Sequence, residues 1–401
     1  MSEYQSTAIT NSPGKFSKIV MIVTPLITIP GILMRLGVFH NGPGTEALIF
    51  GFSLLGAAFI LSWAAEVVQM DISQGFALAI LALIAVLPEY AVDMVFAWDA
   101  GKDIALSELA LANMTGANRL LIGLGWPMVL LIFFLRSKKK ALQLHKGHST
   151  EVFYMACATV YAFSIPFKGS LSLVDAAVLI SIFIVYIIRT ARAEVEEPDL
   201  VGPAAIIGKL QNKPRRMVTY ALFLYAGFII FISAEPFAHS LKNFATQAGM
   251  DEFLVVQWLA PLASEAPEFM VAGIWAFRLQ AQAAIGALIS SKVNQWTLLV
   301  GTLPIVFSIS AGKIGALPLD LRQDHEIWLT AGQSIFAVAI LTNLRMSWYG
   351  AIILAVLFLA QLIFAEIRME VFYIYLAFAA LILIRDRKRI PSLFKIGLKF
   401  K

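Results

Sequence analysis

Two short stretches place acidic residues beside proline in regions that are otherwise apolar. They read AVLPEYAVD (Ala85 to Asp93) and ASEAPEFMVAG (Ala263 to Gly273). Glu89 and Asp93 are four residues apart, and Glu265 and Glu268 are three apart, so each pair projects from one face of a helix. One acid at the centre of a membrane helix costs about 2.5–3.5 kcal/mol, so four acids indicate function. Such groups bind cations or hold protons, and an antiporter needs both alternatives.

The two prolines of these stretches add a second feature, because proline donates no N–H and clashes with the carbonyl four residues earlier. Pro88 and Pro267 are therefore expected to break their helices and to free the carbonyl oxygens of Ile84 and Ala263. Free backbone is tolerated at membrane depth only where protein buries it or water reaches it. A cation would satisfy it equally well.

Polar residues in small-residue surroundings accompany the acids, and helix–helix hydrogen bonds are the alternative interpretation of each. The candidate cation ligands of this kind are Asn113, Asn118, Ser264, Ser291, Asn294 and Gln295. Arg119 and Lys292 occupy nearly matching places and are predicted to compensate the acids as internal cations. Four acids against two bases leave two negative charges, which one divalent ion, two protons, or one monovalent ion with one proton would balance.

The elements that must position these residues are membrane helices. Of the 401 residues 59% are hydrophobic and 14% charged, which is typical of a polytopic all-α membrane protein and not of a soluble domain. Apolar windows of bilayer-spanning length recur along the chain and predict about twelve transmembrane helices. Their approximate spans are 17–38, 45–69, 75–98, 104–135, 151–167, 171–192, 217–241, 251–278, 281–311, 326–345, 347–367 and 369–385.

Basic residues predict the topology, since Lys and Arg concentrate in cytoplasmic loops. The loop clusters are Arg136, Lys138, Lys139, Lys140 and Lys146 after the fourth span, and Arg189, Arg192, Lys209, Lys213, Arg215 and Arg216 after the sixth. With twelve crossings both termini lie on the same cytoplasmic side. The lone Cys157 lies within a span, so neither an internal disulfide nor a multi-cysteine metal site is expected.

The chain contains a duplicated unit. Besides the two Pro-Glu stretches, HSTEVFYMACATVYAFSI from His148 resembles DHEIWLTAGQSIFAVAIL from Asp324. Matching helices are five spans apart, an odd number, so the two five-helix repeats should be inverted. The predicted organisation is an N-terminal tail and extra helix (1–44), a first repeat (45–192), a cytoplasmic linker (193–216), a second, inverted repeat (217–367), and an extra C-terminal helix with a basic tail (368–401).

These motifs resemble the sodium/calcium exchanger superfamily of cation antiporters. Its members carry two inverted repeats, each with a TSLPE-like stretch in one helix and a GNxxGSN-like stretch in the next. This chain reads AVLPE and ANMTGAN in the first repeat, and SEAPE and GALISSK in the second. The resemblance implies that Glu89 and Glu268 are the central metal-binding glutamates.

The chain also departs from the family pattern. Ala85 and Val86 replace both hydroxyl residues of the first repeat, and Glu265 stands where the second repeat is expected to have one. Lys292 replaces the asparagine of the second GSN-like stretch, and Leu121 replaces a further polar ligand, for which the second repeat has Gln295. A first repeat with so few neutral oxygens favours proton coupling over multi-sodium coupling.

The sequence therefore predicts a secondary active cation antiporter that moves Ca²⁺ or Na⁺ in exchange for H⁺ (or Na⁺) by alternating access, in the plasma or inner membrane. No cofactor is expected beyond the transported ions, and the predicted partners are cations, protons and the lipid bilayer, with no nucleic acid. A transport-inactive scaffold of exchanger fold is one alternative. An intramembrane enzyme is another, although no H-E-x-x-H or G-x-S-x-G motif is present.

Overall fold

The computed structural model of the chain describes residues 15–71, 86–190, 200 and 202–391. Several predicted segments lie partly outside the described residues. These are the N-terminal tail before Lys15, the third predicted span before Val86, the first part of the 193–216 linker, and the basic tail after Pro391.

Within the described residues the chain is mostly helical, and its helices follow the predicted spans. The α-helices are α1 (Lys15–Arg35), α2 (Pro43–Val68), α4 (Leu87–Lys102), α5 (Ser107–Leu120), α6 (Trp126–Ser137), α7 (Ser149–Ala162), α8 (Leu173–Thr190), α9 (Pro203–Gly208), α10 (Asn212–Gln247), α11 (Glu252–Phe277), α12 (Ala281–Asn294), α13 (Val300–Ser310), α14 (Leu321–Leu341), α15 (Trp348–Ile363) and α16 (Arg368–Arg385). Short 3₁₀ turns are η1 (Ile104–Leu106), η3 (Lys146–His148), η4 (Pro166–Lys168) and η6 (Ala365–Ile367).

Two π-helical segments interrupt the long central helices at corresponding places. η2 (Leu121–Gly125) joins α5 to α6, and η5 (Gln295–Leu299) joins α12 to α13. Single π-helical turns are uncommon and often lie at functional sites. These π-helical segments were not predicted from the sequence.

Seven helices of the described chain are long and apolar enough to cross a membrane, so the protein is an integral membrane protein. They span residues 17–35, 43–68, 104–137, 173–190, 212–247, 281–310 and 365–385. The finer prediction of twelve crossings depends on shorter or more polar helices such as α7, α11 and α14. The capping box of Asp320 and Gln323 begins α14 at Leu321, one turn before the start predicted from the sequence.

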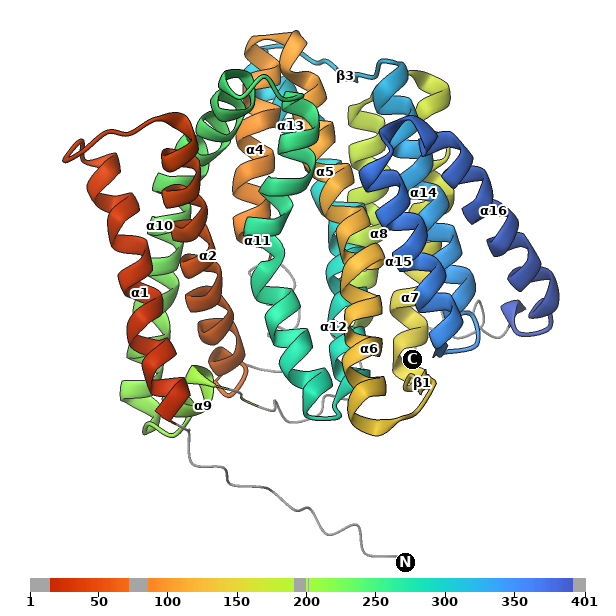
Figure 1. The fold of residues 1–401 in the computed structure, drawn as a ribbon, viewed down its shortest axis with the longest axis horizontal. Coiled ribbons are helices and arrows are strands. Elements are labelled where there is room, and N and C mark those ends of the chain that lie inside the picture. The colour runs from red at the N-terminus through yellow and green to blue at the C-terminus, as the bar shows by residue number, and fades with distance from the viewer. Residues whose placement is uncertain (1–14, 72–85, 191–199, 201, 392–401) are drawn as a thin grey trace, which may run out of the picture.

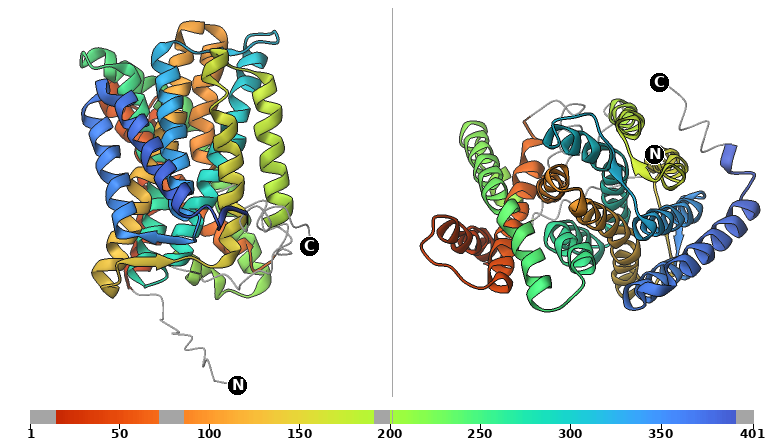
Figure 2. Two further views of the ribbon diagram at one scale, coloured as in Figure 1. Left: turned by 90° about the vertical axis from the view of Figure 1, so that its right-hand side faces the viewer. Right: turned by 90° about the horizontal axis from the view of Figure 1, so that it is seen from above.

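The helices form one bundle in which α4, α5, α11 and α12 lie in the middle (Figure 1). Seen from above, α1 and α16 lie at opposite edges of this bundle (Figure 2). The additional helices predicted at the two ends of the chain therefore flank the centre and do not form it.

Two small antiparallel sheets join distant parts of the chain at opposite ends of the bundle (Figure 1). Strand β1 (Ala141–Gln143) pairs with β4 (Arg345–Ser347), and β2 (Ser170–Leu171) pairs with β3 (Leu317–Pro318). Each sheet therefore pairs a loop segment from the N-terminal half of the chain with one from the C-terminal half.

Helices α4 and α11 run in opposite directions through the bundle. The end of α4 lies beside α13, where Ser310 Oγ donates a hydrogen bond to the Trp98 carbonyl oxygen (2.6 Å). The end of α11 lies beside α6, where Arg136 Nε donates to the Phe277 carbonyl oxygen (3.2 Å). Since α13 leads to β3 and α6 leads to β1, the two helices end on opposite sides of the bundle (Figure 1).

Glycine allows α5 and α11 to approach closely at the centre. A Cβ atom on Gly116 would lie 1.9 Å from the backbone carbonyl oxygen of Gln257. Backbone cannot yield as a flexible side chain does, so only glycine permits this contact. Small residues serve this purpose in membrane helix packing generally.

We expect Gly116→Ala to separate α5 from α11 and to lower stability by about 1–3 kcal/mol, the usual cost of overpacking a core. The measurement is thermal unfolding of the purified protein in detergent. Gly227→Ala on α10 is the matched control, because its Cβ would meet nothing within 4 Å. Equal unfolding temperatures for the two variants would contradict the close approach.

Candidate functional site

The four predicted acids lie on the two central helices that run in opposite directions. Glu89 and Asp93 belong to the first two turns of α4, and Glu265 and Glu268 lie in the middle of α11. Glu89, Asp93 and Glu265 are 3%, 0% and 1% exposed, whereas Glu268 is half-buried. The structure thus brings the four carboxyl groups into the interior of the bundle.

The two prolines behave differently from one another. Pro88 lies in the first turn of α4, where a missing N–H costs no intrahelical hydrogen bond. Pro267 lies inside the continuous helix α11, together with Pro261. The prediction that Pro267 breaks its helix is therefore wrong, because tertiary packing maintains α11 on both sides of it. Ile84, whose carbonyl Pro88 was expected to free, lies outside the described residues.

Amide side chains from the neighbouring helices contact the acids. Asn113 Nδ2 on α5 donates to Asp93 Oδ1 (2.8 Å). Gln295, the first residue of η5, donates from Nε2 to Glu265 Oε1, and its amide also interacts with Glu89. Gln295 thereby connects the acid of α4 with the acid of α11.

Electrostatic repulsion acts across this group of acids. Glu89 interacts with the charges of Glu265, Asp93 and Glu268, and Glu265 interacts with those of Glu268 and Asp93. Like charges in low dielectric repel strongly unless a cation or protons intervene. A bound cation or protons would relieve this repulsion.

Several oxygens of the site are buried and have no hydrogen-bond partner among the described residues. They are Glu89 Oε1, Asp93 Oδ2, Asn113 Oδ1, Glu265 Oε2 and Gln295 Oε1. Buried polar atoms are normally satisfied, and carboxylate and amide oxygens are the ligands that hard cations prefer. Among the described residues no group of three or more Asp, Glu, His or Cys residues has the geometry to hold a metal ion.

The predicted serine and asparagine ligands lie in different positions. Ser264 Oγ donates to carbonyl oxygens of its own helix, those of Ala260 (3.2 Å) and Pro261 (3.4 Å). Ser291 lines a cavity of about 300 Å³ together with Glu268. The cavity lies between α2, α8, α11 and α12, and it extends to Gln69 and Thr190 at the ends of α2 and α8. Glu268 and Ser291 thus line a cavity that reaches the ends of α2 and α8.

Asn118 and Asn294 face other side chains of the centre. Asn118 Oδ1 accepts a hydrogen bond from Lys292 Nζ (2.7 Å), and its amide nitrogen donates to the Met114 carbonyl oxygen (2.8 Å). Asn294 Oδ1 accepts from the Tyr90 hydroxyl (2.8 Å). Tyr90, which the sequence analysis did not select, therefore ties α4 to α12 beside the acids.

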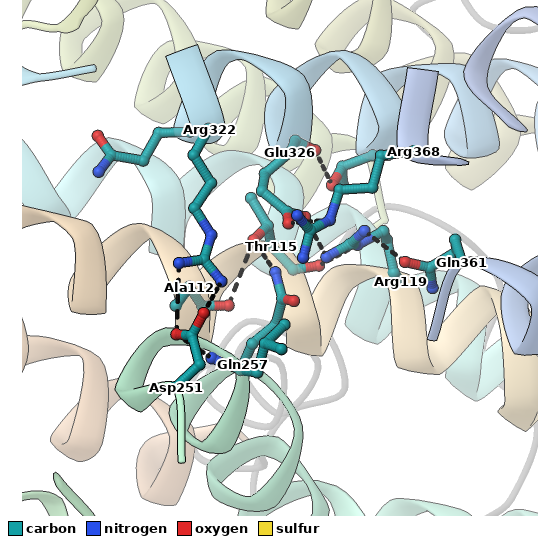
Figure 3. A network of polar contacts seen from close by, with 12 residues as sticks. Ala112, Thr115, Arg119, Asp251, Gln257, Arg322, Glu326, Gln361 and Arg368 are labelled. Atoms are coloured by element: carbon teal, nitrogen blue, oxygen red, sulfur yellow. Dashed lines mark hydrogen bonds and ion pairs between the residues drawn. The ribbon is translucent and has the colours of Figure 1, made fainter. Parts of the chain in front are cut away.

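Arg119 does not compensate the central acids, contrary to the sequence prediction. Its guanidinium forms an ion pair with Glu326 of α14, donates to Gln361 Oε1 of α15 (2.8 Å), and stacks over the Trp258 ring. Glu326 Oε1 also pairs with Arg368 Nε of α16 (2.7 Å). Figure 3 shows this second cluster of charges.

Glu326 and Arg368 of the second cluster were missed because the predicted spans placed them at or just outside helix ends. The span predicted from residue 326 placed Glu326 at a helix end, whereas α14 begins at Leu321 and Glu326 is fully buried. Arg368 was likewise placed just before the predicted span 369–385. An acid next to the apolar run IWLTAGQSIFAVAIL was the available signal.

The sodium/calcium exchanger protein family matches residues 47–191 and 218–365 of the chain. A comparison with curated proteins finds no significant match. Among solved structures, that of the H⁺/Ca²⁺ exchanger CAX is similar to this chain with a TM-score of 0.92 and 46% sequence identity, and the similarity covers 96% of this chain and 98% of that one.

Two more distant structures share the fold. Native YfkE is 18% identical over 86% of this chain and 98% of its own, with a TM-score of 0.62. The sodium-calcium exchanger NCX_Mj is 16% identical over 80% of this chain and 98% of its own, with a TM-score of 0.54.

We expect Glu326→Gln to lower the free energy of unfolding by about 3–5 kcal/mol, because it leaves two arginines without their buried counter-charge. Denaturant titration of the purified protein in micelles measures this. Glu235→Gln is the matched control, since its ion pair with Arg35 is about half exposed and is worth about 1 kcal/mol or less. A loss as small as that of the control would show that Glu326 does not balance the arginines.

Proposed function

The chain belongs to the sodium/calcium exchanger family, and on that premise we propose that it is a secondary active antiporter that exchanges Ca²⁺ for H⁺. The family matches most of the chain, and the H⁺/Ca²⁺ exchanger CAX is 46% identical to it over nearly its whole length. This similarity favours Ca²⁺ over Na⁺ as the transported ion.

The observation that carries the proposal is the group of unpartnered oxygens between α4, α5, α11 and η5. We assign the carboxylates of Glu89, Glu268, Asp93 and Glu265 as the charged cation ligands, with Glu89 and Glu268 as the central metal ligands. The proposed neutral ligands are Asn113, Gln295, Ser291 and Ser264, whereas Asn118, which was predicted with them, holds the ammonium group of Lys292. A carboxyl group that binds Ca²⁺ cannot hold a proton at the same oxygen, so the two ions displace each other.

The proposed architecture is two inverted five-helix repeats, 45–192 and 217–367, joined by the 193–216 linker. Three observations support it. Helices α4 and α11 run in opposite directions, and the π-helical segments η2 and η5 lie at corresponding places of the two repeats. Strands β1 and β2 of the first repeat correspond to β3 and β4 of the second, so the pair β1–β4 corresponds to the pair β2–β3. With the flanking segments 1–44 and 368–401, this organisation gives twelve crossings.

The cavity beside Glu268 is the proposed access route from one side of the membrane. Its far end lies near the ends of α2 and α8, and α8 ends in the basic Arg189. The strand β1 and the helix α9, which adjoin the two basic loops, lie at one end of the bundle (Figure 1). We assign this end and both termini to the cytoplasm of a cell with the protein in its plasma or inner membrane.

Alternating access follows from the position of the acids. Glu268 is reached from the cavity, whereas Asp93 and Glu265 are buried away from solvent. Transport requires that another conformation open the same carboxyl groups toward the other side, as inverted repeats permit. No resident cofactor is needed, because the transported ions are the only reactants.

We expect Glu268→Gln and Glu89→Gln each to abolish Ca²⁺-dependent proton movement in everted membrane vesicles, because each removes a charged ligand and a proton-holding group. Glu235→Gln is the control and should retain transport, since Glu235 is exposed and paired with Arg35. Proton movement in either site variant equal to that of the unchanged protein would refute the assigned site.

The ion is tested separately in proteoliposomes that contain the purified protein. Proton flux should follow added Ca²⁺ and should be absent with Na⁺ or K⁺ alone. If Na⁺ but not Ca²⁺ drove proton flux, the transported ion would be Na⁺. If none of the three ions drove proton flux, the result would favour a transport-inactive scaffold.

A further inference from the structure

We propose that the ammonium group of Lys292 is a tethered cation that permanently occupies one cation position of the exchange site and so excludes Na⁺ from it. This inference rests on the proposed function, since it explains which ions the site accepts. It makes Lys292 a specificity-determining residue.

The surroundings of Lys292 are those of a bound cation. Nζ donates to Asn118 Oδ1 (2.7 Å) and to the Asn118 carbonyl oxygen (3.3 Å). It also lies 4.4 Å from the centre of the Trp296 ring, within the range of a cation–π contact. Amide oxygens, backbone oxygens and aromatic faces all favour positive charge.

The ammonium group lies in the same buried region as the acids of the site. Lys292 is completely buried on α12, and its charge interacts with those of Glu265 and Glu89. Gln295, which follows α12 as the first residue of η5, donates a hydrogen bond to Glu265 and interacts with Glu89. The ammonium group and the carboxyl groups therefore belong to one electrostatic unit.

Arg119, the residue in the corresponding place of the other half, cannot share this role. Its guanidinium is paired with Glu326 in a separate cluster, which also contains Arg368. Of the two basic residues at these corresponding places, Lys292 is the one whose charge interacts with the central acids. The two halves of the protein are thus similar in sequence but different in charge.

A count of charges shows what Lys292 contributes. The four acids together carry four negative charges when ionised, and Lys292 offsets one. The site is then neutral with three protons, and also with one Ca²⁺ and one proton. Exchange of one Ca²⁺ for two protons therefore keeps the buried site neutral, as low dielectric requires, without any Na⁺.

Removal of the ammonium charge leaves one positive charge missing in both states. Na⁺ takes oxygen ligands, and the oxygens of Asn118 that Lys292 contacts would become available to it. A variant without this charge should therefore bind Na⁺ at the vacated position, whereas the unchanged protein should not.

The test is Ca²⁺ uptake into proteoliposomes by Lys292→Gln, with Na⁺ replaced by choline at a constant ionic strength of about 0.1 M. We expect Na⁺ to change the uptake rate of this variant about five-fold or more, the lower range of ordinary coupling between two ligands. The unchanged protein and Lys292→Arg, which retains the charge, should not respond to Na⁺. Lys313→Gln, which removes an exposed lysine after α13, is the charge-matched control and should not respond either.

Thermal unfolding in detergent provides a measurement that does not depend on transport. Na⁺ should raise the unfolding temperature of Lys292→Gln and not that of the unchanged protein, because only a ligand that binds the folded state stabilises it. The proposal would be overturned if the unchanged protein responded to Na⁺. It would also be overturned if Lys292→Gln responded to Na⁺ neither in Ca²⁺ uptake nor in its unfolding temperature. If the unchanged protein fails to exchange Ca²⁺ for protons, the proposed function fails, while the thermal shift still tests the cation position.

Discussion

The balance of buried charge is the constraint on which the rest of this structure depends. Three carboxyl groups of α4 and α11 are almost completely buried, where an unbalanced charge costs several kcal/mol even after relaxation. Amide donors of Asn113 and Gln295 and the ammonium group of Lys292, all from surrounding helices, offset this cost. Oxygens that still lack partners among the described residues are the ones that we propose as ligands of the transported cation. The same burial that makes negative charge costly there would favour a bound cation or protons.

The second buried cluster explains how peripheral helices are tied to the centre. Arg119 lies next to Asn118, the residue that contacts Lys292, and its partners Glu326, Gln361 and Arg368 come from α14, α15 and α16. The C-terminal helix at the edge of the bundle is therefore connected to the region of the central acids by two neighbouring residues of α5. The halves share a pattern of helices, yet they use their corresponding basic residues for different purposes.

Much of the architecture could be predicted, because membrane helices are determined by the local distribution of apolar residues. Most helices of the described chain coincide with the predicted spans to within one or two turns. The exceptions are α9, which lies in the predicted linker, and α4, which begins at Leu87 within the span predicted from residue 75. The paired Pro-Glu stretches led to the correct family for the same reason, since a charge in an apolar helix is conspicuous in sequence alone. The π-helical segments and the uninterrupted course of α11 could not be predicted, because packing against neighbouring helices outweighs local preference there.

By itself the sequence determined that the protein is a membrane protein of exchanger type and that Glu89, Asp93, Glu265 and Glu268 are its central acids. Residue type and spacing along one helix are sufficient for such conclusions. Only the tertiary structure decided which partner each charge has, since Arg119 and Lys292 occupy similar places in sequence and face different helices. The physical reason is that Coulomb attraction depends on distance in space, and residues as far apart as Arg119 and Gln361 meet only after the helices pack.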